Sequence, residues 1–138
     1  MNYVAKTLLA DPSGRYLLLR RSGTHPRYAY HLDLPGGEVD ADELHLEAGA
    51  REIAEETGIM ISPSNLHEVY RKQVTPTKTY LVLEGTLPAG DPDMTISWEH
   101  DEYYWLTPDE LVTAERPVGM DDYMGTVLEY LENRQTLD

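Results

Sequence analysis

Short apolar runs separated by polar turns dominate the first two thirds of the chain. Residues 3–9 alternate weakly and are rich in strand-forming residues, and the apolar run 16–19 follows the tetrapeptide Asp-Pro-Ser-Gly. Asp, Pro and Gly at the first, second and fourth positions are typical of a type I turn, so the two runs predict a β-hairpin. Further strands are predicted at 66–73 and 78–85, and the run Tyr-Leu-Val-Leu indicates that the second is central in its sheet.

A helical pattern replaces the alternation over about residues 43–57. Apolar side chains recur there on one side at about 100° per residue. Three glutamates cluster on roughly the opposite side at i, i+3 and i+4, where side chains are neighbours. They are Glu52, Glu55 and Glu56. Ala48 and Gly49 are expected beside this acidic side, where their small size would leave room for a ligand.

Two more helices complete the predicted elements. Thr107 precedes a proline and Glu110 stands three residues after it, which is the pattern of a capping box at a helix start. A last amphipathic helix is predicted to begin at Asp121 or Asp122, because apolar residues recur at helical spacing beyond them. Together the elements predict an α/β (α+β) sandwich with a mixed β-sheet, and the length of 138 residues predicts one domain.

Charge and cysteine content narrow the classes of function. The formal charge of −14 repels a nucleic-acid backbone, so no nucleic-acid polymer is expected as a partner. The same field opposes an anionic small substrate, so metal ions or a local basic patch must attract one. The chain has no cysteine, which excludes thiol chemistry and fits a cytoplasmic location. It has neither a bilayer-length apolar run nor a signal-peptide pattern, so no membrane partner is expected.

The acidic side of the predicted helix calls for a counter-charge. Like charges at i, i+3 and i+4 destabilise a helix by a few tenths of a kcal/mol per pair, and Mg²⁺ or Mn²⁺ among the carboxylates would remove that cost. The alternative is a solvated acidic face. Gly58 follows the helix where a left-handed residue is favoured, and Gly36 and Gly37 allow a tight backbone turn beside the carboxylates. This context favours the metal site.

These residues resemble the motif of a known family. Gly37, then Glu43 after five intervening residues, then after seven more the run Arg51-Glu-Ile-Ala-Glu-Glu-Thr-Gly-Ile59 match the Nudix box without a mismatch, and Leu34-Pro35-Gly36 resembles its lead-in. The resemblance implies a Nudix fold, in which the box forms a loop-helix-loop motif against a mixed sheet between helices. It also implies hydrolysis of a diphosphate linkage with Mg²⁺ or Mn²⁺.

Roles for the box residues follow from the resemblance. Glu52, Glu55 and Glu56 match positions that usually ligate the metal, and the backbone of Gly37 is a further possible ligand. Glu52 is either a ligand or the general base. Arg51 matches a position that orients the carboxylates, so Arg51, Glu52 and Glu55 are expected to be catalytic. Loop support is implied for Gly36, Glu43 and Gly58.

Outside the box, carboxylates and aromatic residues are candidates for the rest of the site. Residues 96–106 resemble the acidic segment and strand that follow the box in many family members, and Glu102, then Glu99, is expected as an additional base or ligand. The basic loop before the box and Trp98 are expected to bind the substrate by phosphate contacts and base stacking. The candidates before the box are Arg20 at the end of the second strand and Arg27, Tyr28 and Tyr30 in the loop, and Glu99 is also a candidate for substrate binding. For Trp98 a core position is equally open.

The resulting functional hypothesis is a compact nucleotide pyrophosphohydrolase. The 36 residues before the box favour a nucleoside triphosphate or related nucleotide as substrate. The alternatives are a nucleotide sugar, ADP-ribose or another nucleoside-diphosphate-linked small molecule, or a dinucleoside polyphosphate. From a different class, a nucleotide-sensing binding module of the same fold stays open. Many members of the family are dimers, so a homodimer is possible.

Overall fold

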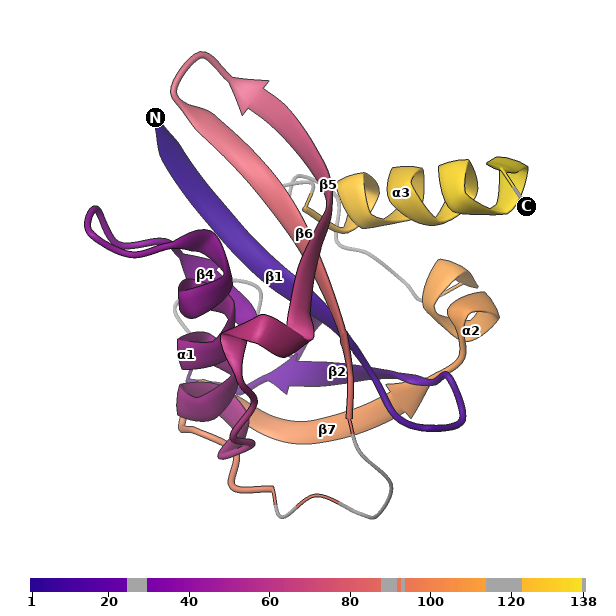
Figure 1. The fold of residues 1–138 in the computed structure, drawn as a ribbon. Helices are drawn as coiled ribbons and strands as arrows, with labels where there is room; N and C mark the ends of the chain where they lie inside the picture. Colours follow the sequence, from indigo (N-terminus) through magenta and orange to yellow (C-terminus); the bar gives the residue numbers. More distant parts are fainter. Residues whose placement is uncertain (25–29, 88–91, 93, 114–122, 138) are drawn as a thin grey trace.

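One mixed sheet of seven strands runs through the part of the chain that the structure describes (Figure 1). The computed structural model describes residues 1–24, 30–87, 92, 94–113 and 123–137. The strands are β1 (Asn2–Ala10), β2 (Tyr16–Arg21), β3 (Leu32–Asp33), β4 (Gly36–Glu38), β5 (Leu66–Thr75), β6 (Lys78–Thr86) and β7 (His100–Leu106). The helices are α1 (His45–Thr57), α2 (Pro108–Thr113) and α3 (Tyr123–Leu137), with a short 3₁₀ turn at Pro63–Asn65.

Strand β1 organises the sheet. The order is β3-β2-β1-β6-β5, with β4 paired to β1 and β7 paired to β2. Strand β6 runs parallel to β1 along the length of that strand and lies between it and β5, so the prediction of a central strand there is confirmed. The predicted hairpin of β1 and β2 is correct only at the turn, where Ala10 pairs with Tyr16. Beyond that pair β2 pairs with β3 and β7, and β1 pairs with β4 at Val4–Lys6 instead.

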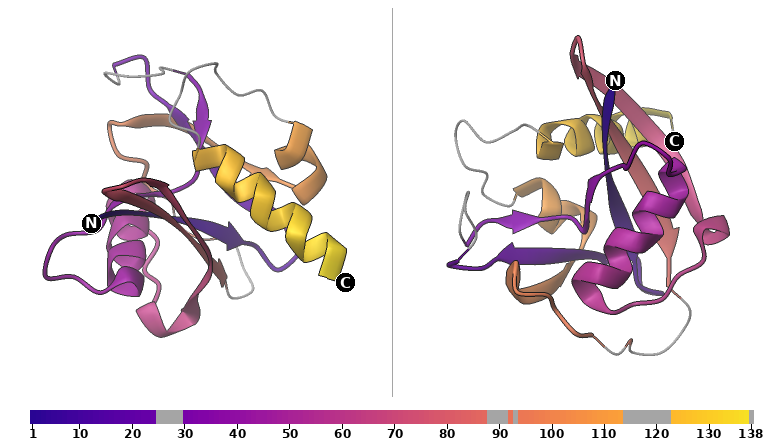
Figure 2. Two further views of the ribbon diagram at one scale, coloured as in Figure 1. Left: turned by 90° about the horizontal axis from the view of Figure 1, so that it is seen from above. Right: turned by 90° about the vertical axis from the view of Figure 1, so that its left-hand side faces the viewer.

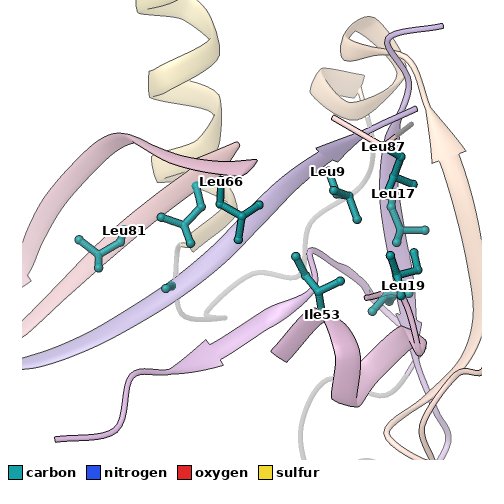
Figure 3. Packing of buried hydrophobic residues seen from close by; sticks show 10 residues of the cluster. Leu9, Leu17, Leu19, Ile53, Leu66, Leu81 and Leu87 are labelled. Carbon is teal, nitrogen blue, oxygen red and sulfur yellow. The ribbon is translucent and has the colours of Figure 1, made fainter. Parts of the chain in front are cut away.

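Apolar side chains cover both faces of this sheet. Alternate residues of a strand point to opposite faces, so Leu9 belongs to the cluster with Ile53 of α1, whereas Leu8 belongs to the cluster with Leu111 of α2 and Val127 of α3. The two views of Figure 2 place β1 between α1 and α3. Figure 3 shows the first cluster, which includes Leu9, Leu17, Leu19, Ile53, Leu66, Leu81 and Leu87. The predicted sandwich is therefore confirmed.

Helix α1 has the predicted extent to within two residues and the predicted end. Ile53 and Thr57 from its apolar side are fully buried. Gly58 ends the helix with φ of 75°, and its N–H donates to the carbonyl of Ala54 at 2.9 Å. This is the left-handed cap that the glycine predicted.

The expectation that Ala48 and Gly49 leave room for a ligand is wrong. Ala48 is fully buried, and a Cβ on Gly49 would lie 2.5 Å from the side chain of Leu83. The acidic side of α1 is turned partly towards the sheet, because β4 packs beside the helix. Core side chains fill the space next to these small residues, and the small residues permit close packing rather than ligand entry.

The C-terminal helices follow the predicted starts as far as the structure describes them. Thr107 Oγ1 accepts from the N–H of Glu110 at 3.2 Å, and Glu110 Oε1 accepts from the N–H of Thr107 at 3.0 Å, so the capping box is confirmed. Asp121 and Asp122, the predicted start of the last helix, lie outside the described residues, and α3 is described from Tyr123. Within the described ranges no helix has the length and apolar character that a membrane crossing requires.

Candidate active site

Two consecutive glycines of β4 bring the backbone against two glutamates of α1. The N–H of Gly36 donates to Glu56 Oε2 at 3.0 Å. A Cβ on Gly37 would lie 2.8 Å from Glu52 Oε1, closer than real Cβ atoms approach. Gly36 itself has φ of 153° and lies directly on Lys6 of β1. The missing side chain of Gly37 thus leaves the space that the Glu52 carboxylate occupies, and that of Gly36 lets the backbone lie close to β1, where its N–H binds Glu56.

Glu56 is a buried carboxylic acid, with only 6% of its surface exposed. Burial raises the pKa of the Glu56 carboxyl to about 9, and the nearby charges of Glu52 and Asp33 raise it further, against the opposing effects of the Gly36 N–H and Lys6. Desolvation disfavours the charged form of a carboxylate. Burial therefore favours the protonated form of Glu56 although Lys6 is nearby, and a further positive charge would favour the ionised form.

Glu52 lies next to it in a similar environment. Burial raises the pKa of the Glu52 carboxyl, Arg51 opposes that shift, and the charges of Glu55 and Glu99 add to it. The negative charges of Glu52, Glu55 and Glu99 therefore repel one another at this end of α1. Their mutual repulsion marks the location at which a cation would be most strongly attracted.

Arg51 holds the carboxylates of the loop and the helix together. Its Nε and Nη2 donate to the two oxygens of Glu43 at 2.7 and 3.0 Å, and its Nη1 donates to Glu52 at 3.0 Å and to Glu55 at 3.2 Å. Nη2 also donates to the carbonyl of Glu38 at 3.2 Å. The side chain of Glu55 is the most open of the three helix glutamates, with 57% of its surface exposed. Arg51 thus fixes Glu43 and Glu52 and leaves Glu55 accessible.

The donor set fits a hard divalent cation in its chemistry. Carboxylate oxygens and a backbone carbonyl are the ligands that Mg²⁺ and Mn²⁺ prefer, and a cation would stabilise the ionised forms of Glu52 and Glu56, which burial disfavours. Among the described residues, no three acidic, histidine or cysteine side chains already converge as metal ligands. In this arrangement Arg51 and the N–H of Gly36 engage the carboxylate oxygens instead.

Residues 94–99 pack against the C-terminal end of α1. The N–H of Thr95 donates to the carbonyl of Thr57 at 2.8 Å, and the N–H of Ser97 donates to the carbonyl of Glu56 at 3.1 Å. These bonds satisfy carbonyls that a helix end leaves without partners. They also bring Glu99 near enough to act on the pKa of Glu52. The adjoining Trp98 is 69% exposed, so its alternative role as a core residue is excluded.

Arg20, Glu102 and Tyr30 form a separate group at the edge of the sheet. Arg20 makes a bidentate pair with Asp101 at 2.8 and 2.9 Å, lies 3.4 Å from Glu102, and has its guanidinium 5.6 Å from the centre of the Tyr30 ring. Glu102 also accepts from the hydroxyl of Tyr104 at 2.8 Å. The structure therefore brings Arg20 and Tyr30 together but ties Glu102 to an arginine. Arg27 and Tyr28, which were also predicted to bind substrate, lie outside the described residues.

Three charged residues near Glu56 were missed by the sequence reasoning. Lys6, Arg21 and Asp33 form a half-buried ion cluster in which Asp33 binds both cations. The lysine within the mostly apolar strand β1 is the signal in the sequence that could have indicated this cluster. Two surface hollows elsewhere border the loop before α1 and are lined by Glu43 and Glu47, but not by Glu52, Glu55 or Glu56.

Comparisons with known proteins agree with this geometry. The family model described as NUDIX domain matches residues 3–125. A MutT-like protein of Streptomyces ambofaciens is 39% identical over 71% of this chain and 58% of its own length. An asymmetrical bis(5'-nucleosyl)-tetraphosphatase of Rattus norvegicus is 35% identical over 69% of this chain and 65% of its own length. The chain therefore spans less than two thirds of each of these two relatives.

Two further matches each cover most of this chain and most of the matched protein. An 8-oxo-dGTP diphosphatase of Haemophilus influenzae is 32% identical over 83% of this chain and 82% of its own length. The crystal structure of a MutT protein from Methanosarcina mazei Go1 superposes with a TM-score of 0.72 at 30% identity, over 96% of this chain and 94% of that one. Both the sequence and the arrangement of the elements are thus shared with these proteins.

Proposed function

The chain belongs to the Nudix family, and on this premise we propose that it hydrolyses a phosphoanhydride bond of a nucleotide with the aid of Mg²⁺ or Mn²⁺. The observation that carries the proposal is the burial of Glu56 beside Glu52. An ionised carboxylate in such a position is costly unless a positive charge compensates it. A divalent cation supplies that charge and at the same time attracts a polyphosphate, which the net charge of −14 would otherwise repel.

The proposed ligands are Glu52, Glu55, Glu56 and the backbone carbonyl of Gly37. A cation held there supplies charge neutralisation at the phosphate and lowers the pKa of a bound water. Arg51 keeps Glu52 in place through the bond of 3.0 Å between them. This fixed position matters because misplacement of a reacting group by about 1 Å can lower a rate about 100-fold.

Glu99 is the better candidate for an additional base or ligand than Glu102. The charge of Glu99 acts on Glu52, and the backbone of its segment is bonded to the end of α1. Glu102 pairs with Arg20 and Tyr104. We therefore propose that either Glu52 or Glu99 accepts the proton of the attacking water, since a general base has to lie within hydrogen-bond reach of that proton.

A nucleoside triphosphate is the proposed substrate. A relative that is matched over most of both chains carries the name of an 8-oxo-dGTP diphosphatase, and a purine base can stack on the exposed Trp98. A dinucleoside polyphosphate is the second candidate, because another relative is named for cleaving one. Both substrates share a polyphosphate chain that requires the same cation.

A substrate panel with matched variants tests the proposal. The panel contains nucleoside triphosphates, dinucleoside polyphosphates, ADP-ribose and nucleotide sugars, each with Mg²⁺, with Mn²⁺ and with EDTA. We expect metal-dependent product release from the wild type and a loss of at least about 100-fold in Glu52→Gln and Glu56→Gln. Glu129→Gln, which removes a carboxylate from the exposed side of α3, should keep full activity. Nucleotide binding without turnover on any of these compounds would favour the sensing module.

A further inference from the structure

An open hollow with a mainly apolar lining lies where the start of α1 meets the turn before β5. The helix and this turn lie side by side (Figure 1). The hollow has a volume of about 560 Å³, and its apolar lining comes from Leu44, Leu46 and Pro63. Strand β5 is at the end of the strand order, so the hollow opens at an edge of the sheet. It is separate from the proposed metal ligands on α1.

Leu44 is an apolar residue at a position that favours polar ones. It is the N-cap residue of α1, where Ser, Thr, Asp and Asn are preferred because their side-chain oxygen accepts a hydrogen bond from the first turn. Leucine has no such oxygen, and the Leu44 side chain is 71% exposed. Leu44 therefore neither caps the helix nor fills the core. Contact with a binding partner would give this exposed leucine a role that the fold does not.

Carboxylates lie around the apolar lining. The hollow includes Glu43, Glu47 and Glu68. An adjoining hollow of about 420 Å³ shares the first two of these residues and adds Asp40 and Asp42. The apolar lining thus borders a surface of acidic side chains.

Arginines compensate only part of this negative charge. Arg71 pairs with Glu68, which also lies 3.1 Å from the ring of His45. Arg51 pairs with Glu43, and its guanidinium is shared with the glutamates of α1. Within the described ranges Asp42 and Glu47 have no ion pair, and both are exposed. The surface around the hollow therefore keeps an excess of negative charge.

We propose that the hollow is a docking site for a cationic segment of a protein partner, which places an apolar side chain against Leu44. Apolar contact supplies affinity, and basic residues beside the anchor would pair with Glu47 and Asp42. A second copy of the chain is a poorer match, because each copy carries 25 acidic and 11 basic residues. An anionic lipid surface would be repelled for the same reason. The inference goes beyond the proposed hydrolysis and does not depend on it.

Two fluorescent peptides of equal charge test the docking site by fluorescence anisotropy. One peptide has two leucines between two pairs of lysines, and the other has serines in place of the leucines. The wild type should bind the leucine peptide at least about fivefold more tightly, because burial of apolar surface adds to the charge attraction. Leu44→Ser should remove most of this preference, and Leu44→Met should keep it.

Stability separates this loss of binding from a loss of folding. Serine is a favourable N-cap residue, so Leu44→Ser should unfold at the same temperature as the wild type or at a higher one. Glu47→Gln should weaken the binding of both peptides about 2- to 5-fold. The glutamine can still accept the hydrogen bond that Glu47 receives from the N–H of Leu44.

Met60→Ser and Glu129→Gln are the matched controls. Met60 is 86% exposed beyond the other end of α1, and Glu129 pairs with Lys72 on α3. Both variants should bind the leucine peptide within about twofold of the wild type. Equal binding of the two peptides by the wild type, or equal losses in Leu44→Ser and Met60→Ser, would overturn the inference. A wild-type dimer in sedimentation that Leu44→Ser separates would also overturn it, because a second copy would then occupy the hollow.

Discussion

Glu56 accepts a hydrogen bond from the backbone N–H of Gly36 at 3.0 Å, across twenty positions of the chain. The next residue, Gly37, lies against the carboxylate of Glu52. Strand β4 thus acts as a template on which two glutamates of α1 are positioned. The precision of the proposed metal site depends on the absence of side chains at these two glycines.

Gly37→Ala should lower catalysis more than it lowers stability. The new methyl group would lie 2.8 Å from Glu52 Oε1 and 3.0 Å from its Cδ, so the carboxylate has to move. We expect a loss of kcat of about 100-fold, with a thermal midpoint close to that of the wild type. Gly14→Ala is the matched control. Gly14 has φ of 87° in an open turn, so its substitution should cost about 1–2 kcal/mol of stability and leave kcat intact.

Arg51→Lys should destabilise the loop before α1. The guanidinium makes a two-bond contact with Glu43 and also reaches Glu52, and a lysine cannot reproduce that fork. A loss of about 1–3 kcal/mol in the free energy of unfolding is expected from urea titration. Arg71→Lys removes a similar two-bond contact with Glu68 from an arginine that is 53% exposed, and it should cost less than about 1 kcal/mol. Equal losses in the two variants would contradict the special role of Arg51.

The pH dependence of metal-free stability should report on Glu56. Its pKa is about 9 in the folded protein and lies near 4.5 in the unfolded chain, so the unfolded state releases a proton that the folded state retains. Metal-free stability should therefore be fully present below about pH 4.5 and should fall as the pH rises towards 9, by at most about 1.4 kcal/mol per pH unit. Glu56→Gln abolishes the titration.

Urea unfolding in EDTA at pH 5 and pH 8 provides the measurement. The free energy of unfolding of Glu56→Gln minus that of the wild type should be larger at pH 8 than at pH 5. Glu55→Gln serves as the control for loss of a carboxylate on the same helix, since the Glu55 side chain is 57% exposed. A difference between Glu56→Gln and the wild type that does not depend on pH would contradict the assigned titration.

Features that depend on neighbours in the sequence were predictable, and features that depend on distant partners were not. The extent of α1, its glycine cap and the capping box before α2 are local, and the sequence analysis located them. The pairing of β1 with β6 along its length, while it meets β2 at the turn, and the burial of Gly49 depend on long-range packing. Periodicity places a residue on a helix face but does not tell which element covers that face.

The same distinction between local and long-range features applies to the candidate site. The box residues were identified by their resemblance to the family motif, and their roles remain predictions. Arg20 and Arg21 are adjacent in the sequence and look equivalent there, yet one pairs with Asp101 and the other with Asp33. Only the register of β2 with β3 and β7 separates them. The one-domain organisation, the cytoplasmic location and the homodimer likewise remain predictions.

Glu99 and Glu102 should behave differently when each is changed to glutamine. The charge of Glu99 acts on Glu52, whereas Glu102 pairs with Arg20 and Tyr104. We expect Glu99→Gln to lower kcat about 100-fold or more and to remove the acidic limb of the pH–rate profile if Glu99 is the base. Glu102→Gln should change kcat less than about fivefold, because an exposed ion pair contributes little. A larger loss of kcat in Glu102→Gln than in Glu99→Gln would favour Glu102 as the base, as the sequence predicted.

Trp98 should contribute to nucleotide affinity by stacking. Its side chain is exposed in the segment that closes over α1, next to Glu99. Stacking of a base on an aromatic ring contributes about 1–3 kcal/mol, so Trp98→Ala should raise the Kd for a nucleotide about 5- to 150-fold. Trp98→Phe keeps a ring and should retain most of the affinity. The chain has two tryptophans, and the other one, Trp105, packs against the core. Nucleotide should quench the tryptophan fluorescence of the wild type and of Trp105→Phe but not that of Trp98→Ala. This pattern would assign the contact to Trp98. Unchanged affinity in Trp98→Ala would show that the base lies elsewhere.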